Sequence, residues 1–109
     1  MSLTPQQFRE IALSFEGAEE RTHMHHPDFR VGGKIFATLG YPNDSYGVVM
    51  LTPEEQNVML QTYPKAFVPV KGKWGERGST TVILKQATKT AAKDALELAW
   101  DRVKDRRVR

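Results

Sequence analysis

The sequence predicts an α+β domain in which a single antiparallel sheet packs against helices. Three observations support this fold class. Apolar residues recur with helical spacing near both ends of the chain, segments of β character lie between them, and glycine- or proline-containing turns separate those segments. The expected order is α-β-β-β-α-β-β-α, within one domain that covers residues 1–109.

Two of the expected helices begin with the same capping motif. Thr4 can serve as the N-cap of a helix from about residue 5 to residue 15, and Gln7 completes a capping box. Thr52 and Glu55 repeat this arrangement and predict a short helix that ends before Pro64. One apolar face of the first helix is formed by Phe8, Ile11, Ala12 and Phe15.

The three strands between these helices are expected within residues 21–51. Gly32-Gly33 has the composition of a two-residue hairpin turn that needs positive φ. Such a turn would pair Val31 with Lys34 and Phe29 with Phe36. Apolar residues would then lie on both faces of the hairpin, so we expect helices to cover one face and a loop, a second copy of the chain or a ligand to cover the other. The second face carries Ile35, Ala37 and Leu39.

The second half of the chain is expected to supply two more strands and a long helix. The strands occupy residues 66–70 and 79–84 and flank a glycine-rich loop, "KGKWGERG". Thr88 or Thr90 begins the helix, and a basic tail over about residues 102–109 is expected to fray. The apolar stripe of this helix consists of Ala92, Ala95, Leu96, Ala99, Trp100 and Val103.

Composition excludes several classes of protein. The chain has no cysteine, so disulfide frameworks and thiolate chemistry are ruled out. It has neither a long apolar run nor the pattern of a signal peptide near its start, so we expect a cytoplasmic protein without a membrane partner. No nucleophile elbow surrounds a serine. We therefore expect no enzyme and no cofactor, and the net charge of +3 permits nucleic-acid binding without requiring it.

Three histidines in "THMHH" raise the question of a metal site. If these residues form one strand, His23 and His25 share a face and His26 points to the other. Asp28 is the only further ligand type nearby, which is too few for a zinc site, so we expect no metal and leave the role of the histidines open. A small-ligand site near His23, His25, Asp28 and Trp74 remains an alternative.

The glycine-rich loop combines basic residues with an aromatic side chain. Lys71, Lys73 and Arg77 could contact phosphates while Trp74 stacks on a base. The string "GKWG" also imitates the GxxG clamp of KH domains, although that clamp lies between helices and this loop lies between expected strands. In the competing interpretation, Trp74 packs on the sheet and contributes only buried area.

Several motifs in order resemble the MmcQ/YjbR family of small bacterial proteins. They are "HPDFRVGGKIFATL", "LTPEEQ", "AFVPVKGKWGERGSTTVIL" and the late apolar residues Ala95, Leu96, Ala99 and Trp100. The resemblance implies a compact α+β fold like that of type III secretion chaperones and of the frataxin-like sandwich. Members of this family are often labelled DNA-binding, because paired hairpins resemble a double-wing motif. No catalytic residues come with the resemblance.

Transferred to this chain, the resemblance makes the Gly32-Gly33 hairpin and the 71–78 loop the two wings. We therefore expect a non-enzymatic module that binds DNA weakly, mainly through phosphates. The alternative is a protein-binding or chaperone-like adaptor, which could form a homodimer through its sheet face and bury Phe29 and Phe36 there. The candidate nucleic-acid contacts are Arg30, Lys34, Lys71, Lys73, Trp74 and Arg77.

Overall fold

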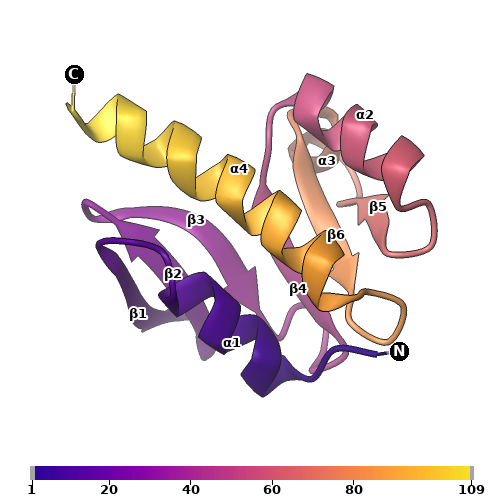
Figure 1. Cartoon of the computed structure of the whole chain (residues 1–109), viewed down its shortest axis with the longest axis horizontal. Helices are drawn as coiled ribbons and strands as arrows, with labels where there is room; N and C mark the ends of the chain where they lie inside the picture. The colour runs from indigo at the N-terminus through magenta and orange to yellow at the C-terminus, as the bar shows by residue number, and fades with distance from the viewer. Residues whose placement is uncertain (1, 109) are drawn as a thin grey trace.

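The structure is a computed structural model that describes residues 2–108, with side chains as far as residue 104. Four helices and six strands follow one another along the chain (Figure 1). The helices are α1 (Pro5–Leu13), α2 (Pro53–Thr62), α3 (Lys73–Glu76) and α4 (Lys89–Val108). The strands are β1 (Ala18–His23), β2 (His26–Val31), β3 (Lys34–Leu39), β4 (Tyr46–Met50), β5 (Phe67–Pro69) and β6 (Ser79–Ile83).

All six strands form one antiparallel sheet in the order β1-β2-β3-β4-β6-β5. Helices α1 and α4 pack on one face of it, and α4 crosses the strands diagonally (Figure 1). The predicted α+β class with a single antiparallel sheet is thereby confirmed. Among the described residues, no helix is both long enough and apolar enough to span a bilayer.

The predicted helix starts are confirmed in atomic detail. The Gln7 amide donates to Thr4 Oγ1 at 3.0 Å, and the Thr4 amide donates to Gln7 Oε1 at 2.9 Å. Thr52 and Glu55 make the same reciprocal pair at the start of α2. These bonds satisfy backbone donors that have no partner inside the helix, which is why each helix begins where its capping box stands.

The structure has one more strand before α2 than the three that were expected. The segment predicted as a single strand through the histidines instead reverses direction, because Met24 (φ 49°) and His25 (φ 67°) form a two-residue turn between β1 and β2. His23 and His26 are therefore cross-strand partners on the same face, and the prediction that His23 shares a face with His25 is wrong. Histidine tolerates positive φ better than most residues, but two-residue hairpin turns strongly prefer glycine with asparagine or aspartate, so the composition of this turn does not indicate it.

The Gly32-Gly33 turn forms as predicted and pairs Val31 with Lys34, but Phe29 pairs with Ala37 rather than with Phe36. A β-bulge shifts the register after Phe29 and leaves Phe36 as the extra residue on β3. Phe36 and Ala37 are both fully buried as a result. The prediction of a Phe29–Phe36 pair is wrong because the simple alternation of a hairpin does not include this insertion.

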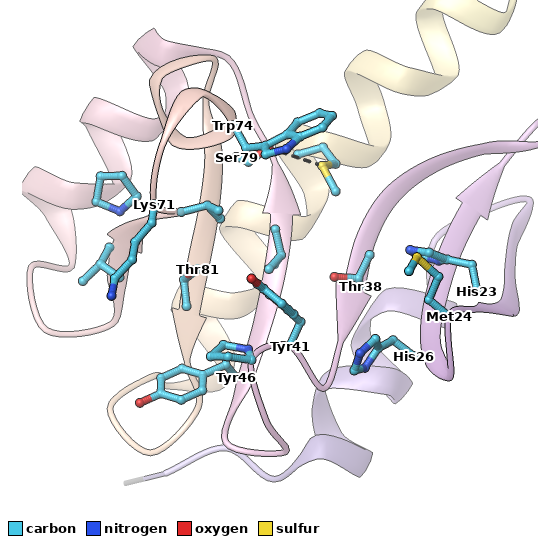
Figure 2. A pocket seen from close by; sticks show the side chains of 16 residues that line it. His23, Met24, His26, Thr38, Tyr41, Tyr46, Lys71, Trp74, Ser79 and Thr81 are labelled. Carbon is cyan, nitrogen blue, oxygen red and sulfur yellow. Dashed lines mark hydrogen bonds between the residues drawn. The ribbon is translucent and has the colours of Figure 1, made fainter.

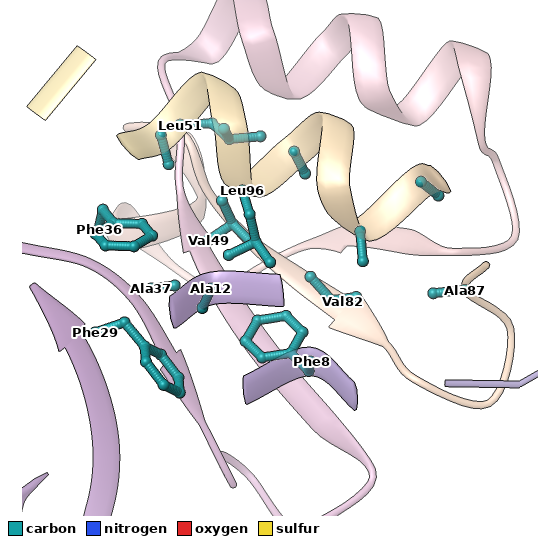
Figure 3. Packing of buried hydrophobic residues seen from close by; sticks show 14 of the residues in the cluster. Phe8, Ala12, Phe29, Phe36, Ala37, Val49, Leu51, Val82, Ala87 and Leu96 are labelled. Carbon is teal, nitrogen blue, oxygen red and sulfur yellow. The ribbon is translucent and has the colours of Figure 1, made fainter. Parts of the chain in front are cut away.

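The core lies between the sheet and the two helices α1 and α4 (Figure 3). Phe8 from α1 packs against Phe29 from β2, with ring centroids 6.1 Å apart. Leu96 is fully buried on α4 between small neighbours, which allow this helix to lie close to the strands. The buried alanines of α4 are Ala91, Ala92, Ala95 and Ala99.

Side chains near the end of α4 attach this helix to the rest of the domain. The Trp100 indole stacks on Phe15 at 5.3 Å and donates from Nε1 to the Glu16 carbonyl at 2.8 Å. Arg102 donates to the Met50 carbonyl and approaches Glu55 Oε1 at 3.4 Å. Arg102, the first basic residue of the predicted tail, therefore serves packing; α4 continues through that tail to Val108, and residue 109 lies outside the described residues.

Candidate nucleic-acid interface

A groove with a volume of about 920 Å³ crosses the sheet face opposite α1 and α4 (Figure 2). Successive residues of a strand point to opposite faces, so the neighbours of the core residues Ala37, Val49 and Val82 form this second face. The nearly buried side chains Thr38, Val48 and Thr81 are its floor. The prediction that Ala37 and Leu39 lie on the second face is wrong, because the bulge after Phe29 reverses the alternation of β3. Both residues are buried in the core, and Thr38 faces the groove instead.

The two long walls of the groove come from segments far apart in the sequence. His23, Met24 and His26 lie on one side, at the β1–β2 hairpin, while Lys71 and Trp74 lie on the other, before and within α3 (Figure 2). Tyr41 and Tyr46 line the groove between these walls (Figure 2). Five aromatic or imidazole side chains therefore surround a floor of small residues. These five side chains are His23, His26, Tyr41, Tyr46 and Trp74.

Large apolar side chains are exposed mainly around this groove. Within the described part of the chain six of them are exposed, and all but Leu13 and Val58 line the groove. Trp74 has 67 % of its surface exposed, so the interpretation in which it packs on the sheet is wrong. The four that line the groove are Met24, Tyr41, Val68 and Trp74. Such a concentration of exposed apolar side chains is typical of binding surfaces.

The glycine-rich segment is a packed helical turn and not an open phosphate-binding loop. Lys73–Glu76 forms α3, and a Cβ atom added to Gly75 would lie 1.7 Å from the Val70 carbonyl oxygen. The buried Gln56 amide also donates to the Gly75 carbonyl at 3.0 Å. Glycine at position 75 thus reflects close backbone packing, and the segment that contains it carries Lys71 and Trp74 beside the groove.

A buried charge network lies next to the histidine wall. Asp28 is completely buried and accepts from Arg30 Nε at 2.8 Å and from Arg30 Nη2 at 3.1 Å. Its Oδ2 atom also lies 2.7 Å from Nδ1 of His23. The hydrogen bonds from Arg30 hold the pKa of Asp28 below its usual value, the contact with His23 acts in the same direction, and burial opposes both.

One of the comparisons with known proteins finds a match. The family model of YjbR matches residues 13–102. The chain belongs to the YjbR family. No curated protein and no solved structure matches it.

The six predicted contact residues of this YjbR domain do not form one cluster. Lys71 and Trp74 line the groove, with Lys73 and Arg77 on the same short segment. Lys34 is exposed beside the Gly32-Gly33 turn. Arg30 forms an ion pair with Asp28, so the Gly32-Gly33 hairpin, the first predicted wing, has little free positive charge.

The predicted small-ligand site is partly assembled. His23 and Trp74 line the same groove and Asp28 lies behind His23, whereas His25 is in the turn and is not part of the lining. Among the residues described, no three His, Cys, Asp or Glu side chains come together as a metal site. The tyrosines of the groove were missed, because only the fold brings Tyr41 and Tyr46 to the ends of adjacent strands.

Replacing Asp28 by asparagine should destabilise this YjbR domain at neutral pH, by about 2 kcal/mol. A carboxyl whose pKa is lowered by folding adds stability above its unfolded pKa of about 4, and this stability is lost as the pH falls through the folded pKa. The difference between wild type and Asp28→Asn should therefore shrink in acid. Urea denaturation at about pH 7 and about pH 3 measures it. A difference that is equal at both pH values would contradict the prediction.

Proposed function

We propose that the groove binds single-stranded nucleic acid and that the protein acts as a binding module in the cytoplasm rather than as an enzyme. The observation that carries the proposal is Trp74, an exposed indole on a groove wall among three lysines and arginines. Within the described residues, Lys71, Lys73 and Arg77 have no acidic partner within 4.0 Å. Exposed rings that stack on bases, flanked by cations that contact phosphates, are typical of single-strand binding surfaces.

A single strand fits this arrangement better than a duplex does. Base faces are stacked inside a duplex, and rings such as Tyr41 and Trp74 can reach them only in an unpaired strand. The double-wing alternative needs free cations on both hairpins. On the Gly32-Gly33 hairpin, Asp28 neutralises the charge of Arg30. Among the described side chains, Lys34 is then the one predicted contact of that hairpin without an ion-pair partner. The groove, rather than a pair of wings, is therefore the proposed contact surface.

Trp74→Ala should weaken the binding of a labelled single-stranded oligonucleotide by about tenfold or more, because stacking contributes about 1–3 kcal/mol per base. A triple alanine variant of Lys71, Lys73 and Arg77 should lower the salt slope by about 0.7 for each lost contact. Fluorescence anisotropy at low and near-physiological salt measures both quantities. A duplex of the same sequence should bind more weakly.

A matched control is available on the other side of the molecule. Lys85, Lys89 and Lys93 are exposed, have no ion-pair partner among the described side chains and do not line the groove. Alanine at all three positions removes as much positive charge as the triple variant of Lys71, Lys73 and Arg77. Apart from the effect of the lower net charge, the affinity for the oligonucleotide should stay close to that of wild type. Equal losses in both triple variants, or duplex binding as tight as single-strand binding, would refute the proposed site.

A protein partner is the second candidate, favoured by the exposed apolar side chains around the groove. The prediction that a partner buries Phe29 and Phe36 is wrong, because both rings are already completely buried in the core. Strand addition at a sheet edge is disfavoured as well, since β1 is charged and β5 is short and contains Pro69. Light scattering that finds a dimer dissociated by Trp74→Ala would favour this candidate.

A further inference from the structure

We infer that Arg30 and Asp28 are positioning residues that hold His23 as a phosphate-contacting side chain on the wall of the groove opposite Trp74. This inference rests on the proposed function and extends it to the second wall. It also assigns a different role to Arg30, which the sequence suggested as a direct contact.

The first argument comes from the hydrogen bonds of Asp28. Arg30 contacts both carboxylate oxygens and keeps this group ionised, so the nitrogen that faces it, His23 Nδ1, must carry a proton. The second ring nitrogen, Nε2, is then the one that remains for a ligand. The His23 side chain is 42 % exposed and lines the groove, whereas Asp28 is fully buried behind it.

The second argument is the energetic cost of this arrangement. A fully buried carboxylate loses its hydration, and apolar side chains of similar volume usually stabilise a domain at least as well. Packing alone therefore does not explain Asp28. A carboxylate behind a histidine that faces a groove instead fixes the tautomer and orientation of the ring, as it does at sites where imidazoles act on ligands.

The third argument is the turn that follows His23. Met24 and His25 both have left-handed φ values, which cost about 1 kcal/mol or more for each non-glycine residue. This strained two-residue turn sets His23 directly opposite His26 and places Met24 at the rim of the groove.

The chemical consequence is a contact that depends on protonation. Neutral His23 offers a lone pair at Nε2, and the protonated ring offers an N–H donor and a positive charge suited to a phosphate oxygen. Several charged groups surround it. Arg21 lies opposite Asp28 and Glu19 opposite Arg30 on the neighbouring strand, His26 is the cross-strand partner, and Lys71 stands on the far wall. Imidazole is the side-chain group whose charge ordinarily changes between about pH 5 and pH 8.

The test is the affinity for a single-stranded oligonucleotide at about pH 5.5 and about pH 8, where imidazoles change charge. Wild type should bind on the order of tenfold more tightly at the lower pH. His23→Gln should lose most of this gain, while the control His25→Gln, at a residue outside the groove lining, should keep it.

A second readout tests the positioning role without any ligand. Nitrogen-15 NMR of the imidazoles should find His23 with its proton on Nδ1 in the neutral form, and Asp28→Asn should produce a mixture of tautomers. Mixed tautomers in wild type would overturn the role of Asp28. Binding that does not depend on pH, or a gain lost in His26→Gln rather than His23→Gln, would overturn the inference and leave the proposed function intact. Absence of binding at both pH values would overturn both.

Discussion

Alanine at Gly75 is expected to destabilise the domain by about 4 kcal/mol or more, which is enough to unfold many small proteins. The added Cβ atom would lie 1.7 Å from the carbonyl oxygen of Val70, a distance that requires the backbone to move. Val70 cannot shift freely, because its amide donates to the Ser79 carbonyl at 3.0 Å beside the β5–β6 pair. Urea denaturation followed by circular dichroism measures the loss.

Gly72 provides the matched control for this prediction. It begins the same short segment with φ 80°, and a Cβ atom added there meets nothing within 4 Å. Its ψ of −156° puts it in a backbone region that is essentially restricted to glycine, so Gly72→Ala should cost backbone strain alone, about 1–3 kcal/mol. If the two variants lost equal stability, close packing at Gly75 would not be the reason for glycine there.

Phe36→Ala is expected to cost about 3–5 kcal/mol, as is typical when a completely buried phenylalanine leaves a cavity. The bulge in β3 lets this ring share the core with its neighbour Ala37, although strict alternation would put the two side chains on opposite faces. Phe36→Leu should cost less than about 2 kcal/mol, because most of the apolar volume is kept. This milder variant remains measurable by urea denaturation if the alanine variant does not fold.

Trp74→Ala is the control for Phe36→Ala, because it also removes a large aromatic side chain. Since Trp74 is mostly exposed, its loss should change the free energy of unfolding by no more than about 0.5 kcal/mol. A large loss of stability at Trp74 would mean that the indole serves the core, which would remove the main support for the proposed nucleic-acid site.

Local rules were sufficient to predict most of the fold. Thr4 with Gln7 and Thr52 with Glu55 define helix starts through hydrogen bonds that span only three residues. Gly32-Gly33 indicates a hairpin because glycine readily adopts the positive φ that such a turn requires. The family resemblance is borne out by the match over residues 13–102.

Errors arose where distant packing overrides a local preference. Met24 and His25 form a turn at positive φ although no glycine or asparagine stands there, and the pairing of β1 with β2 sustains it. The bulge at Phe36 interrupts the regular pairing of the hairpin and places the Phe36 ring in the core. In the candidate site, Lys71 and Trp74 were identified from composition, but their position opposite His23 depends on the strand order of the sheet.

The position of α4 in the chain has a consequence for synthesis on the ribosome. This helix follows all six strands and supplies Ala92, Leu96 and Ala99 to the core. A nascent chain that has released the whole sheet therefore still presents the apolar face around Val49 and Val82 to solvent. Folding of this domain must be completed after β6 has emerged, and during that interval the uncovered sheet is the species that chaperones must protect from aggregation.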